Sequence, residues 1–312
     1  MTEPSRWIRC LAVAAAVAAA PLAADSGRTD APPLDAYKLI LVGDSTTAPH
    51  SGWGGAFCAN HVKWRIACLN LGRGARSTRS YRSEGAWDIA LGEMKVPGYE
   101  KVFVVIQLGH NDQARHKPER WTEETKEFPD NLRRFVREAR KAGAVPILVT
   151  PLARREFRDG ELHNTLASWS DQVRKVAAEL KVPLIDLNAR SAQAVQELGA
   201  VAAMDWAQAP PSAEEIEAAR AGTTLPAAPS SPEAVEDKGE RANAPGARGR
   251  VRLKFDYTHL GAQGAKLIAA TMADELALAV PELAALIIPA GGAQPQAAEE
   301  PAPGPSGGAT AR

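Results

Sequence analysis

The chain has 312 residues, with 37 Lys or Arg against 37 Asp or Glu, so its formal net charge at pH 7 is zero. This balance excludes functions that depend on a strongly basic surface, such as binding of nucleic acid or of an anionic membrane by bulk charge. The length alone would allow two domains, but both ends have a non-globular composition, so we expect a single folded domain.

The first 24 residues have the layout of a secretory signal peptide. Arg6 and Arg9 precede an apolar run at 11–20, and Pro21 and small residues follow it. The run is too short for a membrane anchor, because about 20 apolar residues are needed to span a bilayer. We therefore expect residues 1–24 to be removed on export, which gives a secreted or periplasmic protein without stable membrane insertion.

Three cysteines are present, and Cys10 would be lost with the signal peptide. Cys58 and Cys68 would then form an even pair in a compartment that permits disulfides. They form either a disulfide or two buried thiols, and the sequence does not decide between these states.

Between residues 38 and 187, short apolar runs alternate with longer mixed segments, as expected of successive βαβ units. Each run is nearly continuous in apolar residues, which is typical of parallel strands covered on both faces. The pattern predicts an α/β fold with five parallel strands, at 38–43, 65–71, 101–109, 145–150 and 182–187.

Helices are predicted in the gaps between these strands. The clearest spans 123–142, where apolar residues recur at three- and four-residue spacing and Gly143 follows as a C-terminal stop. A second helix is predicted at 162–180, and a third at 262–279 closes the core.

Residues 207–249 are rich in Pro, Ala, Glu, Gly and Ser and contain no aromatic residue. Such a segment buries too little surface to offset its ordering entropy, so we predict a disordered or loosely helical insertion. The tail at 291–312 has the same composition and is predicted to be disordered. The single domain is thus expected to span 38–290 and to contain the insertion.

Polar residues follow the predicted strands, and open parallel sheets bind ligands at the carboxyl ends of their strands. Asp44, Ser45 and Thr46 follow the first strand. A serine on a tight turn before a helix N-terminus can act as a nucleophile, although it can equally be an ordinary N-cap.

The second and third strands are followed by candidate donors to negative charge. Asn111 lies after the third strand, and its side-chain amide can donate to an oxyanion, although Asn-Asp after a strand also forms ordinary turns. Gly72 and Gly74 follow the second strand and would let backbone N–H groups approach a ligand. This loop lacks the Gly-Lys-Ser/Thr ending of a phosphate-binding loop.

Asp256 and His259 stand just before the last predicted helix. A spacing of three lets the carboxylate orient the imidazole, whose other nitrogen can then take a proton from a serine. Such a pair alone is more often a surface turn, but the three motifs above favour a catalytic pair.

Four short motifs in chain order resemble the sequence blocks of the SGNH subgroup of GDSL hydrolases: GDST at 43–46, GARS at 74–77, GHND at 109–112 and DYTH at 256–259. The match covers most of residues 38–270. Three further runs, at 76–81, 84–88 and 107–113, resemble the rhamnogalacturonan acetylesterase branch. The resemblance implies a three-layer α/β/α, flavodoxin-like fold. It also implies a serine esterase that removes acetyl groups from a plant cell-wall polysaccharide, such as rhamnogalacturonan or xylan.

Carried over residue by residue, the resemblance implies that Ser45 is the nucleophile, His259 its base and Asp256 the carboxylate that orients the base. Asn111 and the backbone N–H of Ser45 would bind the oxyanion. A third donor would be the backbone N–H of Ala75 or, as second choice, of Gly74. Ala75 stands where the family usually has Gly, so this donor depends on backbone angles that suit an alanine.

No cofactor or metal is expected, because no histidines show metal-ligand spacing, and the histidines other than His259 are predicted to lie on the surface or in loops. The tryptophans could include a platform on which a sugar stacks, but core packing or partial burial is the expectation for each of them. Arg76 and Arg79 either contact an acidic sugar or hold their loop by ion pairs.

The expected partner is an acetylated polysaccharide or oligosaccharide, bound by a monomer. One alternative is a lipase or thioesterase of the same fold, since related enzymes accept those acyl groups. The other is a carbohydrate-binding protein that retains the fold without catalysis.

Overall fold

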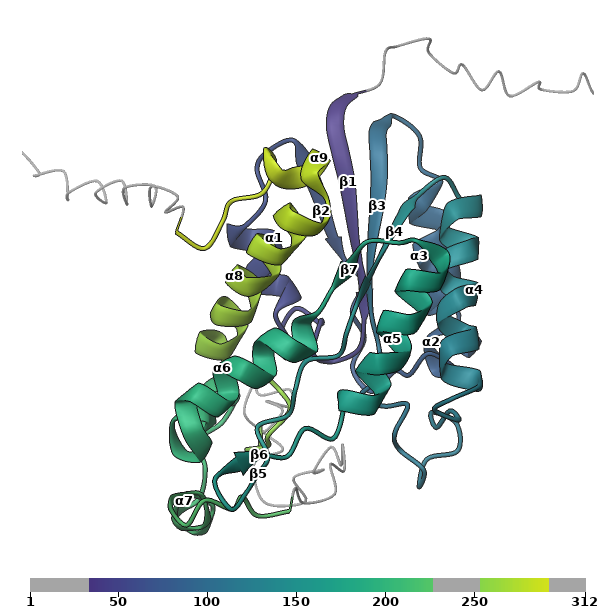
Figure 1. The fold of residues 1–312 in the computed structure, drawn as a ribbon. Coiled ribbons are helices and arrows are strands. Elements are labelled where there is room, and N and C mark those ends of the chain that lie inside the picture. Colours follow the sequence, from purple (N-terminus) through teal and green to yellow (C-terminus); the bar gives the residue numbers. More distant parts are fainter. Residues whose placement is uncertain (1–33, 227–252, 292–312) are drawn as a thin grey trace, which may run out of the picture. The chain divides into compact units, whose positions relative to one another are not determined.

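A computed structural model describes residues 34–226 and 253–291 (Figure 1). The predicted signal peptide at 1–24, residues 227–249 of the predicted insertion and residues 292–312 of the tail lie outside this part. Five strands form one parallel sheet in the order β2-β1-β3-β4-β7, which confirms the predicted α/β class. The strands are β1 (Leu34–Gly43), β2 (Ile66–Asn70), β3 (Tyr99–Gln107), β4 (Val145–Val149) and β7 (Leu184–Ile185).

Side chains of the central strands alternate between two apolar cores, because successive residues of a strand point to opposite faces. In β1, Leu39 and Leu41 enter one core, and Ile40 and Val42 enter the other. The first core is covered by α1 (Gly54–Asn60), α6 (Leu187–Ala202), α8 (Ala262–Ala279) and α9 (Pro281–Ala284). The second is covered by α2 (Ser80–Ser83), α3 (Ala86–Met94), α4 (Glu127–Lys141) and α5 (Ala167–Leu180), so the fold has three layers (Figure 1).

Helix α4 illustrates how the sequence specifies an outer layer. Its apolar residues, among them Phe128, Leu132 and Phe135, are buried against the sheet. Acidic residues lie in its first turn and basic residues in its last, which complements the helix dipole. Gly143 follows at φ 85°, a left-handed conformation that commonly ends a helix. The predicted helix at 123–142 is therefore present but starts later, at Glu127.

The helix predicted at 262–279 coincides with α8, whereas the one predicted at 162–180 is shorter than expected. The helix begins at Ala167, because residue 162 ends a small hairpin of β5 (Phe157–Arg158) and β6 (Glu161–Leu162) and a loop follows. Asp159 and Gly160 form the hairpin turn with φ of 51° and 82°. Asp and Gly are residues that tolerate such angles, which is why this short turn is stable.

Residues 207–226, the first part of the predicted insertion, belong to the folded domain. They follow the short helix η1 (Ala203–Trp206) and contain α7 (Ala213–Arg220), which begins with a capping box between Ser212 and Glu215. Thr224 is buried and accepts a hydrogen bond from the N–H of Phe157 at 2.9 Å. The prediction of a disordered or loosely helical segment is corrected for 207–226 and stays a prediction for 227–249.

Cys58 of α1 and Cys68 of β2 form a disulfide, with Cα atoms 5.5 Å apart. The bridge joins a helix to the neighbouring edge strand of the sheet. Of the two states that the sequence allowed, the structure therefore has the disulfide.

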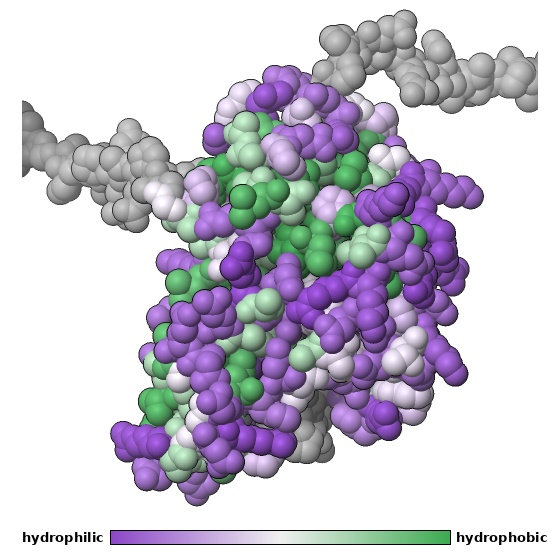
Figure 2. All heavy atoms as spheres, in the orientation of Figure 1, coloured by the Kyte–Doolittle hydropathy of each residue, from purple (hydrophilic) through white to green (hydrophobic). Residues whose placement is uncertain are grey.

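The outer surface over α4 and α5 is mainly hydrophilic (Figure 2). Hydrophobic residues on the same face gather between α8 and α5, over the edge of the sheet that β7 forms. Among the described residues, no helix combines the length and the apolar character that crossing a bilayer would require.

Candidate active site

The predicted nucleophile and base meet at the carboxyl edge of the sheet. Ser45 lies two residues after the end of β1, and His259 lies 214 residues later in the chain. The Nε2 atom of His259 lies 2.8 Å from the Oγ of Ser45, and its Nδ1 lies 2.7 Å from Oδ2 of Asp256. The structure thus brings the three predicted residues into one chain of contacts.

Asp256 both shapes its turn and orients the imidazole. Its Oδ1 accepts hydrogen bonds from the N–H groups of Thr258 and His259, each at 2.7 Å. Burial alone would raise its pKa, but the contacts with His259 and these N–H groups outweigh burial and lower the pKa of Asp256 to about 2. The carboxylate thus remains ionised at neutral pH. It accepts the Nδ1 proton of His259 and leaves the Nε2 lone pair directed at the serine.

The same pKa shift makes Asp256 a source of stability with a defined pH window. Its folded-state pKa lies below the unfolded value of about 3.9, so the contribution is fully present above that pH. The contribution is lost as the pH falls through about 2, where the folded-state carboxylate takes up its proton.

Ser45 lies on a tight turn and is 8% exposed. The carboxylate of Asp44 accepts hydrogen bonds from the N–H and the hydroxyl of Thr46, both at 2.8 Å, which fixes the backbone around the serine. A Cβ on Gly43 would stand 2.2 Å from Oγ1 of Thr47, so only glycine fits where the turn leaves the strand.

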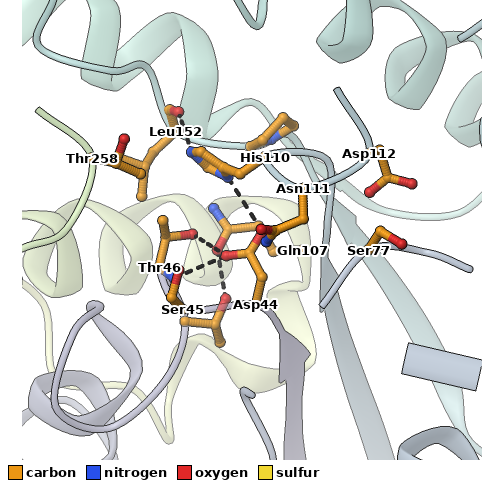
Figure 3. Close-up of polar contacts among 12 residues, drawn as sticks. Asp44, Ser45, Thr46, Ser77, Gln107, His110, Asn111, Asp112, Leu152 and Thr258 are labelled. Atoms are coloured by element: carbon orange, nitrogen blue, oxygen red, sulfur yellow. Dashed lines mark hydrogen bonds and ion pairs between the residues drawn. The ribbon is translucent and has the colours of Figure 1, made fainter. Parts of the chain in front are cut away.

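The side chain of His110 contacts the turn that carries Ser45. The residue is 5% exposed and its Nε2 donates to the carbonyl of Leu152 at 3.0 Å. Its Nδ1 faces Oδ2 of Asp44 at 3.4 Å, and Figure 3 shows the ring between Leu152 and Asp44. Burial works to raise the pKa of Asp44, but His110 and Thr46 outweigh burial and hold it below the ordinary value. His110 thus lies in a loop after β3, as predicted, but its ring is buried and not on the surface.

The candidate oxyanion donors lie beside the serine. The Nδ2 of Asn111 donates to the carbonyl of Arg76 at 3.1 Å, which leaves its second N–H for a ligand. A Cβ placed on Gly74 would lie 3.8 Å from the Cβ of Ser45, so this loop borders the nucleophile. In the part of the chain that the structure describes, the N–H groups of Ser45, Gly74 and Ala75 donate to no protein acceptor.

Asp112 holds this loop against the sheet. Its carboxylate is fully buried and accepts hydrogen bonds from the N–H and hydroxyl of Thr78 and from the hydroxyl of Thr122. Burial raises the pKa of Asp112 to about 7, although these hydrogen bonds work in the opposite direction. The sequence did not predict this role of Asp112, which appeared only as part of a motif. Its hydrogen-bond partners are brought to it by tertiary packing.

Ala75 has φ 65°, in the left-handed region that favours glycine. Replacing Ala75 with Gly is therefore expected to stabilise the protein by about 1 kcal/mol, because the strain on the alanine exceeds the extra entropy of an unfolded glycine. Turnover is expected to change little, since the N–H group is retained. Chemical denaturation and ester hydrolysis check both points, and a clear loss of stability would show that Ala75 is not strained.

The structure shows one of the two alternatives left open for the arginines, the ion pairs. The guanidinium of Arg76 pairs with Glu84, and that of Arg79 pairs with Glu127 and donates to the carbonyl of Pro118. Both side chains therefore hold their loop by ion pairs.

Four of the tryptophans that the structure describes follow the expectation of core positions. Trp53, Trp87, Trp169 and Trp206 are buried. Trp64 is 86% exposed, but it precedes β2 and so lies at the amino end of that strand, away from the candidate site.

Comparison with known proteins matches residues 41–267 to the GDSL-like Lipase/Acylhydrolase family. The chain is 32% identical over 170 residues to the probable rhamnogalacturonan acetylesterase YesY of Bacillus subtilis, an alignment that covers 53% of this chain and 76% of the relative. It is 36% identical over 162 residues to the rhamnogalacturonan acetylesterase RhgT of the same organism, covering 49% of this chain and 66% of the relative.

Among solved structures, the protein YxiM of Bacillus subtilis matches with a TM-score of 0.52 at 21% identity. The match covers 77% of this chain and 56% of that one. At this level of identity, the similarity concerns the fold.

Proposed function

Because the chain belongs to the GDSL-like lipase/acylhydrolase family, we propose that it is a serine esterase that removes acetyl groups from a plant cell-wall polysaccharide. Family membership confirms the resemblance drawn from the four short motifs. One observation carries the proposal of a serine mechanism: the 2.8 Å contact between the Ser45 hydroxyl and the Nε2 of His259. The named activity of two relatives, rhamnogalacturonan acetylesterase, supports the acetyl group and the substrate class.

In the proposed mechanism, the Nε2 of His259 takes the proton of Ser45 as the hydroxyl attacks the acetyl carbonyl. Asp256 holds the ring in the tautomer that accepts this proton. The imidazolium then returns the proton to the sugar oxygen that leaves, and an acetyl-serine remains. Water, activated by the same nitrogen, releases acetate and restores the serine.

The negative charge on the attacked oxygen needs donors that are in place before the reaction. In this proposal they are the second amide N–H of Asn111 and the backbone N–H groups of Ser45 and Ala75, with Gly74 as the alternative to Ala75. Preorganised donors of this kind stabilise the transition state without reorganisation.

Asn111→Ala is expected to fold normally and to lose about a hundredfold to a thousandfold in kcat, because one oxyanion donor is removed. Asn60→Ala is a matched control, since the amide of Asn60 donates to the carbonyl of Ala56 within α1. The control should keep nearly full turnover in the same p-nitrophenyl acetate assay. Equal rates for the two variants would take Asn111 out of the oxyanion site.

The substrate class is tested by acetate release from a panel that contains acetylated rhamnogalacturonan and acetylated xylan. Acetyl and long-chain p-nitrophenyl esters are compared in parallel. The proposal expects acetate release from at least one polysaccharide and faster turnover of the acetyl ester. Faster turnover of the long-chain ester would instead indicate a lipase, and complete inactivity would indicate a binding protein.

We also propose that the enzyme acts as a monomer outside the cytoplasm, without a cofactor. The layout of residues 1–24 supports export. The Cys58–Cys68 bridge supports it as well, because disulfides persist mainly in oxidising compartments.

A further inference from the structure

The side chain of Arg155 lies directly beneath the turn that carries the proposed base. Arg155 follows β4 and is 1% exposed. Its Nη2 donates to the carbonyl oxygen of Asp256 at 2.9 Å and to that of His259 at 3.0 Å. Its Nη1 lies 3.5 Å from the carbonyl oxygen of Thr258. Its backbone N–H donates to the carbonyl of Tyr257 at 2.9 Å. One residue thus contacts every carbonyl of the turn.

Burying a guanidinium in this way is costly unless the charge is compensated. Burial lowers the pKa of Arg155 to about 10, so the side chain still carries its charge at neutral pH. Within the described ranges, no carboxylate forms an ion pair with it and its Nε has no hydrogen-bond partner. Carbonyl dipoles of the 256–259 turn therefore provide the direct compensation.

The contacts of Arg155 differ from those of its neighbour Arg154. Arg154 donates to the side chains of Gln113, Thr165 and Thr258 and to the carbonyl of His110, so it ties several loops together. The guanidinium of Arg155 contacts the backbone of one turn.

The geometry of the turn shows what these contacts do. Carbonyl oxygens of residues 256, 258 and 259 point toward the guanidinium, whereas the N–H groups of Thr258 and His259 point to the carboxylate of Asp256. The cation and the carboxylate thus contact opposite ends of the peptide between Thr258 and His259, and the guanidinium also contacts the carbonyls of the peptides on either side of the turn. Loss of the cation would leave these part-buried carbonyls without the guanidinium donors and would relax the turn.

We propose that Arg155 is a positioning residue for the base: it holds the 256–259 turn so that the imidazole of His259 stays in line with Ser45. This proposal rests on the proposed esterase function. Because Arg155 is 1% exposed, it cannot contact a polysaccharide, and its loss should reduce kcat and leave KM nearly unchanged.

The test compares Arg155→Met, which keeps an unbranched apolar stem without charge or donors, with Arg155→Lys, which keeps the charge. Arg82→Met is the control, because Arg82 is largely buried and pairs with Glu138 in the opposite layer of the fold. The measurements are kcat and KM for p-nitrophenyl acetate, the melting temperature and the far-downfield proton NMR signal of the hydrogen bond between His259 and Asp256.

For Arg155→Met we expect kcat to fall about a hundredfold, as for a misplaced catalytic group, with loss or displacement of the NMR signal. Arg155→Lys should lie between this variant and the wild type, because an ammonium keeps the charge but lacks the planar fork. Arg82→Met should lose stability and keep both kcat and the NMR signal.

Folded Arg155→Met with the kcat and NMR signal of the wild type would overturn the proposal, as would a loss of kcat no larger than that of Arg82→Met. If Arg155→Met does not fold, Arg155→Lys decides by the same two measurements. A wild-type protein that hydrolyses no acetyl ester would instead refute the proposed function. The NMR comparison would still test whether Arg155 positions the base.

Discussion

Replacing Ser45 with Ala is expected to lower kcat for p-nitrophenyl acetate by about a millionfold, the effect of removing a triad nucleophile. The hydroxyl is the group that would form the acetyl-enzyme, and its Oγ lies 2.8 Å from the base. Alanine keeps the backbone of the turn, where the Asp44 carboxylate and Thr46 remain in place. The variant should therefore be folded and inactive.

The matched control is Ser170→Ala, which removes a buried hydroxyl that donates to the carbonyl of Leu166 at the start of α5 and contacts no residue of the proposed triad. It should lose some stability and keep its turnover. Circular dichroism separates loss of fold from loss of chemistry in both variants. Near-normal turnover in Ser45→Ala would remove the covalent mechanism.

The second large effect is expected for Asp256→Asn, with a loss of about ten thousandfold in kcat. The side-chain oxygen of the asparagine can still accept hydrogen bonds from the N–H groups of Thr258 and His259. Its amide nitrogen would then face the Nδ1 of His259, and two donors cannot share that contact. The ring would adopt the other tautomer, in which Nε2 carries the proton and cannot take one from Ser45.

Asp186→Asn provides the comparison, because Asp186 caps α6 and pairs with Arg174 beside the short strand β7. It should reduce stability and leave kcat nearly unchanged. A loss below tenfold in Asp256→Asn would mean that the carboxylate does not set the tautomer of the base.

The sheet was predictable because each parallel strand is a nearly continuous apolar run that ends at a polar motif. Errors in the strands are limited to their ends: β1 begins at Leu34 and not at residue 38, and β7 is reduced to Leu184–Ile185. Helix α8 was placed at its observed bounds, since its apolar face and the motif before it agree. The hairpin of β5 and β6 and helix α7 were missed because they bury few large side chains.

The order of the motifs led to the residues that meet at the site, but the supporting contacts depend on tertiary packing. His110 carries no sequence signal for burial, and its partners Asp44 and Leu152 come from other strand ends. The ion pair of Arg76 could not be predicted, because it depends on where the fold places Glu84. The position of Arg155 under this turn could not be predicted, because it depends on hydrogen bonds to backbone carbonyls, which no sequence pattern displays.

An activated serine at position 45 is tested most directly by covalent labelling with a fluorophosphonate probe, followed by mass spectrometry of the peptides. One phosphonyl group on Ser45 is expected, with labelling much slower in His259→Ala, because the probe needs a serine activated by its base. A folded wild-type protein that takes up no label, or that carries it on another serine, would contradict the assignment.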